Sequence, residues 1–114
     1  MIQKNTTIKL GKIRAHFLNE LEKQYLEVEM LRDKLDQVAD HSETCYAIGR
    51  ICHKIAGTAA TLGFPDLGDI AAQIDDFVAS SWLTHPEAES EMRNHADHLL
   101  VLISLTFEDE SVLV

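Results

Sequence analysis

The sequence predicts an all-α protein, an antiparallel four-helix bundle with short connections between the helices. Apolar residues recur at steps of three and four along most of the chain, which is the period of an amphipathic helix. No segment shows a convincing run of the alternation that indicates a strand, and there is no repeat or low-complexity tract. With 114 residues the chain is long enough for one hydrophobic core and too short for two.

The first and longest helix is expected over residues 10–38. Its apolar stripe consists of Leu10, Ile13, Phe17, Leu21, Tyr25, Val28, Leu31, Leu35 and Val38. We expect the residues before it to wrap around the bundle, to fray, or to add a short extra N-terminal helical segment. A break follows at residues 40–42, where Asp40 and Glu43 resemble a capping box with aspartate in place of serine or threonine.

The second helix is expected to end near Gly63, because glycine is the commonest residue just after a helix C-terminus. Its apolar stripe consists of Cys45, Ile48, Cys52, Ile55, Ala59 and Leu62. Pro65 suits the first turn of a third helix. The stripe of that helix consists of Leu67, Ile70, Ile74, Phe77 and Val78.

A last helix follows a turn marked by Trp82 and Thr84. Thr84 with Glu87, and Pro86 between them, signals the N-terminus of this helix. Its apolar stripe consists of Met92, Ala96, Leu99, Leu100, Ile103 and Phe107. Four such helices with short connections form an antiparallel bundle.

Composition and charge exclude several classes of function. The chain is 46% hydrophobic and 25% charged, which is typical of a globular domain. A net charge of −9 argues against a nucleic-acid partner and against binding to an anionic membrane surface. The longest apolar run, LLVLISLTF, is too short to span a bilayer. The N-terminus lacks the apolar segment of an export signal, so we expect a cytoplasmic protein.

The two cysteines, Cys45 and Cys52, lie seven residues apart on the predicted second helix. That spacing places them about 10 Å apart along the helix axis, too far for a disulfide. We expect both to pack as small apolar groups in a reducing cytoplasm.

The stretch GRICHKIAGTAATLG, residues 49–63, raises a question about His53, because Gly49 precedes it and Gly57 follows it by four residues each. A glycine inside a helix costs about 1 kcal/mol relative to alanine. At 100° per residue, Ile51 and Ile55 lie on the side of the helix opposite His53, so the imidazole is expected to face away from the core.

The outer face around His53 is small and nearly flat, where a solvated helix usually carries Lys, Glu and Gln. Its members are Tyr46, Gly49, Arg50, Ala56, Gly57 and Ala60. We interpret it as a face that a large partner approaches closely. In the alternative, Gly49 and Gly57 relieve crowding against a neighbouring helix, and finding both in a helix seam would count against our interpretation.

The run His53-Lys54-Ile55-Ala56-Gly57-Thr58-Ala59-Ala60, followed by Leu62-Gly63, resembles the signature of histidine-containing phosphotransfer (HPt) domains. The resemblance covers residues 10–107. It implies a phosphocarrier without its own kinase activity, which exchanges a phosphoryl group with receiver-domain aspartates in two-component signalling. The implied partners are response-regulator receiver domains and a hybrid sensor histidine kinase. It also implies a monomer with no cofactor of its own, any Mg²⁺ being supplied by the receiver.

The resemblance also implies the site. His53 is then the phosphorylated nucleophile, acting through Nε2, and Gly57 leaves room for the phosphoryl group. Lys54 and Arg50 would neutralise charge on the transferring oxygens. Gly49, Ala56 and Ala60 complete the docking environment. Ala56 is a departure, because the family often has a lysine there.

A second departure concerns the facing helix, where the family often supplies a glutamine to the imidazole. Folding the hairpin about residues 63–64 places His53 opposite Asp75, with Gln73 two residues earlier. A carboxylate that accepts from Nδ1–H would fix the tautomer with Nε2 free. In the alternative, Asp75 is simply a solvated acid beside Asp76.

Other arrangements fit the sequence less well than the relay does. Glu91, His95 and His98 share a helix face with a spacing that can bind a metal, but that face is expected to be the solvent side of the last helix, so we predict no metal site. A helical adaptor could dock a partner through the same flat face without being phosphorylated. An enzyme with its own active site is disfavoured, because the sequence has no nucleotide-binding motif.

The domain organisation is expected to be a bundle over residues 1–107 and a separate end, EDESVLV, over residues 108–114. The acidic part reads as a tail or as the start of a linker to a following domain, because residues 111–114 resemble the opening strand of a receiver domain. A short disordered C-terminus is the equal alternative.

Overall fold

The structure, a computed structural model, describes residues 2–37, 41–80 and 85–112, with side chains described for 11–37, 41–80 and 85–110. It contains four helices: α1 (Ile2–Lys34), α2 (Ser42–Ala59), α3 (Pro65–Ala79) and α4 (Ala88–Val112). No strand occurs among these residues. The all-α four-helix bundle is therefore confirmed.

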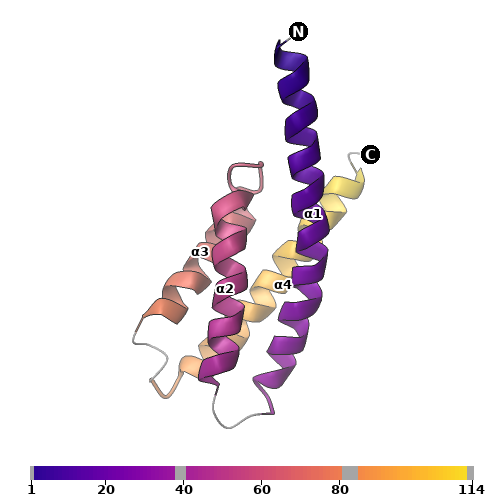
Figure 1. Ribbon diagram of the computed structural model, residues 1–114. Helices are drawn as coiled ribbons and strands as arrows, with labels where there is room; N and C mark the ends of the chain where they lie inside the picture. The colour runs from indigo at the N-terminus through magenta and orange to yellow at the C-terminus, as the bar shows by residue number, and fades with distance from the viewer. Residues whose placement is uncertain (1, 38–40, 81–84, 113–114) are drawn as a thin grey trace.

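Helices α2 and α3 form an antiparallel hairpin, and α1 and α4 lie alongside it (Figure 1). The N-terminal part of α1 extends past the turn of the hairpin, so that the molecule is elongated, with extents of 56 × 24 × 18 Å. Within the described part of the chain, no helix is long and apolar enough to cross a membrane.

The core is formed by the apolar stripe of each helix. Its members with no exposed surface include Leu21, Val28, Leu35, Ile48, Cys52, Ala59, Ile74, Met92, Ala96, Leu99 and Ile103. Burying a Leu or Ile side chain fully contributes about 1.5–3 kcal/mol, which explains why these stripes fix the arrangement. One predicted member is wrong: Ile13 is 51% exposed. Its neighbour Arg14 lies over the ring of Phe64, so this level of α1 is beside the hairpin turn, at the end of the hairpin.

The turn between α2 and α3 follows the predicted signals. The amide of Phe64 donates to the carbonyl of Ala59 (2.8 Å), and the amide of Gly63 donates to that of Ala60 (3.2 Å). These two bonds make a Schellman motif, whose left-handed position Gly63 occupies with φ of +94°. Pro65 stands in the first turn of α3. The register of the whole hairpin depends on this turn.

The other junctions are described in part. Helix α2 begins after His41, which makes no side-chain capping bond; the predicted capping residue Asp40 lies outside the described residues. Trp82 and Thr84 also lie outside them, and α4 begins just after Glu87.

Both ends of the chain differ from expectation. No separate N-terminal segment is present, because α1 is continuous from Ile2. At the other end α4 continues through residue 112, so residues 108–112 are helical, while the division into a bundle over 1–107 and a separate end stays a prediction. Glu110 forms an ion pair with Arg14, whose guanidinium lies over the Phe64 ring at 4.7 Å. The end of α4 is thus tied to α1 and the hairpin turn.

Candidate functional site

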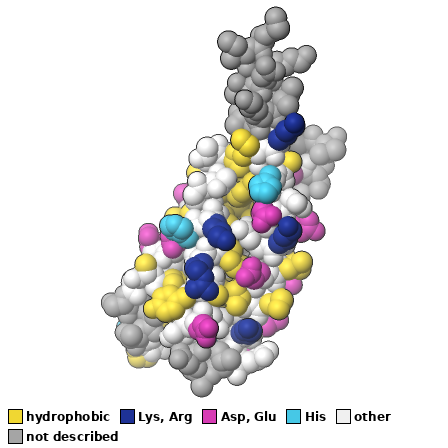
Figure 2. Space-filling model, in the orientation of Figure 1, with side chains coloured by type: hydrophobic (Ala, Val, Ile, Leu, Met, Phe, Trp, Pro, Cys, Tyr) yellow, Lys and Arg dark blue, Asp and Glu magenta, His cyan; other side chains and the backbone are white. Residues whose placement is uncertain are grey.

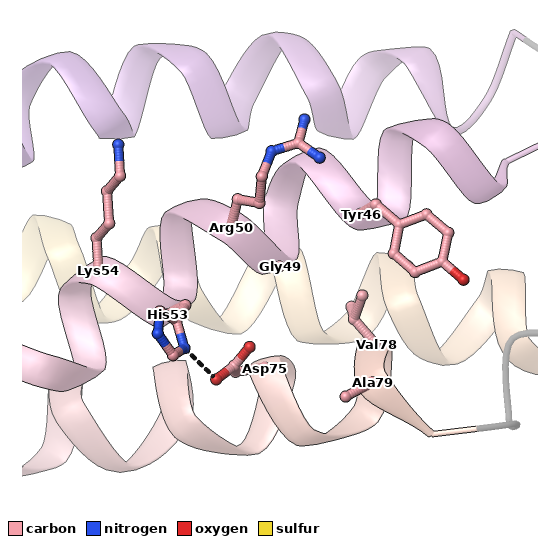
Figure 3. A pocket seen from close by; sticks show the side chains of 8 residues that line it. All are labelled: Tyr46, Gly49, Arg50, His53, Lys54, Asp75, Val78 and Ala79. Carbon is pink, nitrogen blue, oxygen red and sulfur yellow. Dashed lines mark hydrogen bonds and ion pairs between the residues drawn. The ribbon is translucent and has the colours of Figure 1, made fainter.

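His53 lies on the outer side of α2, and 77% of its side chain is exposed. Ile48, Ile51 and Ile55 of the same helix are buried, so the predicted direction of the imidazole is confirmed. The ring lies beside α3, above the seam between the two helices of the hairpin (Figure 3).

Asp75 of α3 holds this imidazole. Its Oδ2 lies 2.8 Å from Nδ1 of His53 (Figure 3). An ionised carboxylate can only accept, so Nδ1–H donates, and in the neutral imidazole Nε2 then keeps its lone pair. Asp75 is half-buried while its neighbour Asp76 is exposed. Of the two residues proposed to orient the ring, Asp75 makes the contact, and Gln73 lies exposed on α3.

Gly49 was interpreted wrongly. It is buried, and a Cβ built on it would lie 2.9 Å from Cγ1 of Val78. Gly49 therefore permits the close approach of α2 and α3, as in the alternative that we had disfavoured. The physical reason is rotational: Gly49 is about 40° from His53 around the helix, on the side that α3 covers.

Gly57 is different, because it lies about 40° from His53 in the opposite direction around the helix, on the side away from α3. It is exposed, and a Cβ there would meet nothing within 4 Å. The prediction of a bare surface next to the histidine is confirmed at this position. Only one of the two glycines lies in the seam, so the condition that would count against the relay is not met.

The two alanines also lie toward α3. Ala56 is half-buried against the core. Ala60 is exposed, but its backbone nitrogen is only 3.3 Å from where a Cβ on Gly68 would stand. The sequence analysis did not identify Gly68, a glycine inside the third helix, as a point of close contact between α2 and α3. Its position within a helix was the available signal, since such a glycine often marks a close approach of two backbones.

Arg50 and Lys54 are exposed and project on the α1 side of α2, away from the imidazole (Figure 3). Neither has an acidic partner within 4 Å among the described side chains, whereas Arg14, Lys23, Arg32 and Arg93 each have one. On the face seen in Figure 2, several Lys and Arg side chains lie over α1 and α2. Although the chain is acidic overall, two cations close to His53 in the sequence therefore have no acidic partner among the described side chains.

A hollow of about 430 Å³ opens at His53 and runs along the hairpin seam. Its lining consists of Tyr46, Gly49, Arg50, His53, Lys54, Asp75, Val78 and Ala79. Val78 and Ala79 were not predicted to belong to the site. The contact between Gly49 and Val78 that brings them there joins two helices, and nothing in the local sequence reveals it.

The predicted solvent face of the last helix needs a correction at His95. Its ring packs against Phe77 of α3, with ring centroids 5.0 Å apart. Burial lowers the pKa of His95, an effect that Glu91 opposes and His98 adds to. No group of three or more His, Cys, Asp or Glu side chains in the described part of the chain is arranged to hold a metal ion.

Both cysteines are free and buried, as predicted. Burial raises the pKa of the Cys52 thiol to about 12 and also raises that of Cys45. They act as small apolar core groups and stand apart from the site.

Fold and site together define a four-helix bundle that presents an exposed imidazole, His53, oriented by a carboxylate from the neighbouring helix. The family model for the Hpt domain matches residues 12–103, and the chain belongs to this family. Comparisons with curated proteins and with solved structures give no significant match. Membership indicates histidine phosphotransfer in phosphorelay signalling. Members in general are phosphocarriers and not kinases, and they interact with receiver domains and histidine kinases.

Proposed function

We propose that this chain is a cytoplasmic phosphorelay intermediate that carries the phosphoryl group on Nε2 of His53. In this proposal a receiver domain of a hybrid sensor histidine kinase donates the group, and a response-regulator receiver accepts it. The observation that carries the proposal is the 2.8 Å hydrogen bond between Nδ1 of His53 and Asp75, on a ring whose side chain is 77% exposed. Without such a hydrogen bond, an exposed imidazole would rotate freely. The bond to Asp75 therefore lets His53 be accessible to a partner and held in one orientation.

The chemistry is a displacement at phosphorus. The Nε2 lone pair attacks the phosphorus of an aspartyl phosphate, and the P–N bond forms as the P–O bond to the aspartate breaks. The partner's carboxylate leaves with the electron pair, and the Nδ1 proton stays in the hydrogen bond to Asp75. Return of the group follows the same steps in reverse. The only protein groups required are a positioned nucleophile and fixed charges.

The surroundings of His53 support this exchange. Gly57 leaves the side of the imidazole open for a bulky phosphoryl group and for the partner's backbone. Among the described side chains Arg50 and Lys54 have no acidic partner, so they can attract an anionic aspartyl phosphate without first breaking an ion pair with any of these groups. In this proposal any Mg²⁺ belongs to the receiver, and the chain acts as a monomer without kinase activity.

The test is transfer from a receiver domain labelled on its aspartate with radioactive phosphate. We expect the wild-type chain to gain an acid-labile, base-stable label, and His53→Gln to gain none. Because His53 is exposed, the variant should unfold at the same temperature as the wild type. Binding of the receiver to the wild type with no transfer of label would contradict the relay and favour the non-phosphorylated adaptor.

A further inference from the structure

The hollow beside His53 continues well beyond the reacting atom. Tyr46 stands seven residues before His53 on α2, two helical turns or about 10 Å along the axis. The hollow extends over this length and has Val78 of α3 on its other side (Figure 3). It is thus one continuous surface with the candidate transfer site, and its far end has no part in the phosphoryl chemistry.

The apolar floor of this hollow follows from the close approach of α2 and α3. Gly49 contributes no side chain and Val78 fills the space where its Cβ would stand. Tyr46 lies beside this floor and is 49% exposed. Tyrosine is among the residue types enriched in the anchors of protein interfaces, and such anchors pack into pockets like this one.

We propose that this hollow is the part of the docking surface that selects the receiver, and that Tyr46 is its main specificity determinant. The occupant is an apolar side chain of a receiver domain, from a segment next to its phosphorylated aspartate. This inference rests on the proposed function. Its orientation is definite: beyond the contact at His53 and Gly57, the receiver extends toward the start of α2 and the end of α3, and not on toward the Gly63 turn.

Two features of the hollow favour a receiver over a second copy of this chain. The first is continuity, because His53 and Asp75 line the same depression as Tyr46. The second is charge, because Arg50 and Lys54 also line it and have no acidic partner within 4 Å in the part of the chain whose side chains the structure describes. A symmetric dimer through this face would bring the cations of both copies together, which is unfavourable. A receiver presents an aspartyl phosphate to them.

The experiment separates docking from chemistry by using two phosphoryl donors. One donor is the phosphorylated form of whichever receiver exchanges fastest with the wild-type chain, and the other is phosphoramidate. Phosphoramidate is small, needs no docking surface, and leaves as ammonia when it phosphorylates an imidazole. The variants are Tyr46→Ala, Tyr46→Phe and a matched control, Leu26→Ala, which removes a side chain that is 56% exposed outside the hollow.

We expect Tyr46→Ala to weaken receiver binding and to slow transfer at sub-saturating receiver by about tenfold or more, the effect of a typical interface anchor. Tyr46→Phe keeps the ring and should stay within about twofold of wild type, as should Leu26→Ala. All variants should react with phosphoramidate at the wild-type rate. Unchanged receiver binding in Tyr46→Ala would overturn the inference, as would an equal loss with phosphoramidate or a concentration-dependent dimer lost in this variant.

These outcomes are distinct from a failure of the proposed function. If neither donor labels His53 in the wild type, the relay itself is wrong. If both donors label wild type and Tyr46→Ala alike, only the docking inference fails. Ala79→Glu provides a second route to the same answer, because it places a charged side chain in the hollow where we expect an apolar side chain of the receiver. It should reduce receiver transfer and leave the phosphoramidate reaction unchanged.

Discussion

Oδ2 of Asp75 lies 2.8 Å from Nδ1 of His53, so a carboxylate from α3 fixes the imidazole that α2 displays. The site therefore needs two helices in the correct register. The Schellman turn at Gly63 supplies that register. Orientation comes from this hydrogen bond while access comes from the open surface at Gly57.

Asp75→Asn is expected to slow phosphotransfer by about 10–100-fold, the usual effect of removing a partner that orients a histidine. An amide can either donate to or accept from Nδ1, so it no longer fixes the tautomer. Single-turnover transfer rates and the ¹⁵N chemical shifts of the ring would measure both consequences. Asp76→Asn, at the exposed neighbour, is the control. Equal rates and equal tautomer ratios in the two variants would show that Asp75 does not orient His53.

The glycines on either side of His53 should respond oppositely to alanine. Gly49→Ala forces a methyl group into Val78 at 2.9 Å, and valine is too stiff to move aside. Overpacking of this kind costs about 1–3 kcal/mol, which outweighs the gain in helix propensity. Gly57→Ala meets nothing and should raise the free energy of unfolding by about 0.5–1 kcal/mol.

Urea denaturation measures both glycine variants. In a Val78→Ala background, Gly49→Ala should destabilise the chain less than it does in the wild type, since the contacts with both γ-methyl groups are removed and only the 3.1 Å approach to Cβ remains. If Gly49→Ala has the same free energy of unfolding as Gly57→Ala, then α2 and α3 do not pack as closely at Gly49 and Val78 as the structure shows.

Reversing the charge of Arg50 or of Lys54 should slow association with the receiver. Lys54→Glu and Arg50→Glu each replace attraction with repulsion next to the transfer site, and we expect roughly tenfold lower association rates at low salt. The difference should shrink as salt is added. The matched control is Lys34→Glu, at an exposed position at the C-terminal end of α1. A drop of equal size in this control would mean that net charge alone governs association.

Stability should fall as the pH drops below about 6.5, the ordinary pKa of histidine. Burial lowers the pKa of His95 in the folded chain, so in this range the unfolded chain binds more protons and protonation favours unfolding. The loss begins as the pH passes below the unfolded pKa and ends at the lowered folded pKa. Asp36, whose pKa is lowered mainly by its hydrogen bond from Arg32, acts only at more acidic pH.

The measurement is the free energy of unfolding of wild type and His95→Gln between pH 7.5 and pH 5. The variant cannot be protonated and should show a flatter profile. His98→Gln, at an exposed position on the same helix, should keep the wild-type slope. A wild-type slope in His95→Gln would assign the effect to other groups.

The sequence predicted what depends on helical periodicity and on the hairpin turn. Burial in a bundle repeats with the helix, so the core stripes and the outward direction of His53 could be read directly. Asp75 was found because Gly63 and Pro65 fix where the hairpin folds. These features are local in the chain, or need only one turn to be known.

The errors arose where a neighbour from elsewhere in the chain decides the outcome. The angle of Gly49 around α2 was known, but not that α3 covers that side. His95 is covered by Phe77 of α3, and the end of α4 is held by the Arg14–Glu110 pair, 96 residues apart in the chain. Such contacts follow from three-dimensional arrangement and leave no periodic signal.

The central claim is that Nε2 of His53 carries the phosphoryl group while Asp75 holds Nδ1. Phosphorus–nitrogen coupling in the NMR spectrum of the ¹⁵N-labelled, phosphorylated chain tests it most directly, because it identifies the bonded nitrogen among six histidines. We predict one phosphorus signal, coupled to Nε2 of His53 and absent in His53→Gln. Phosphorus bonded to Nδ1 of that ring, or to any other histidine, would contradict the account.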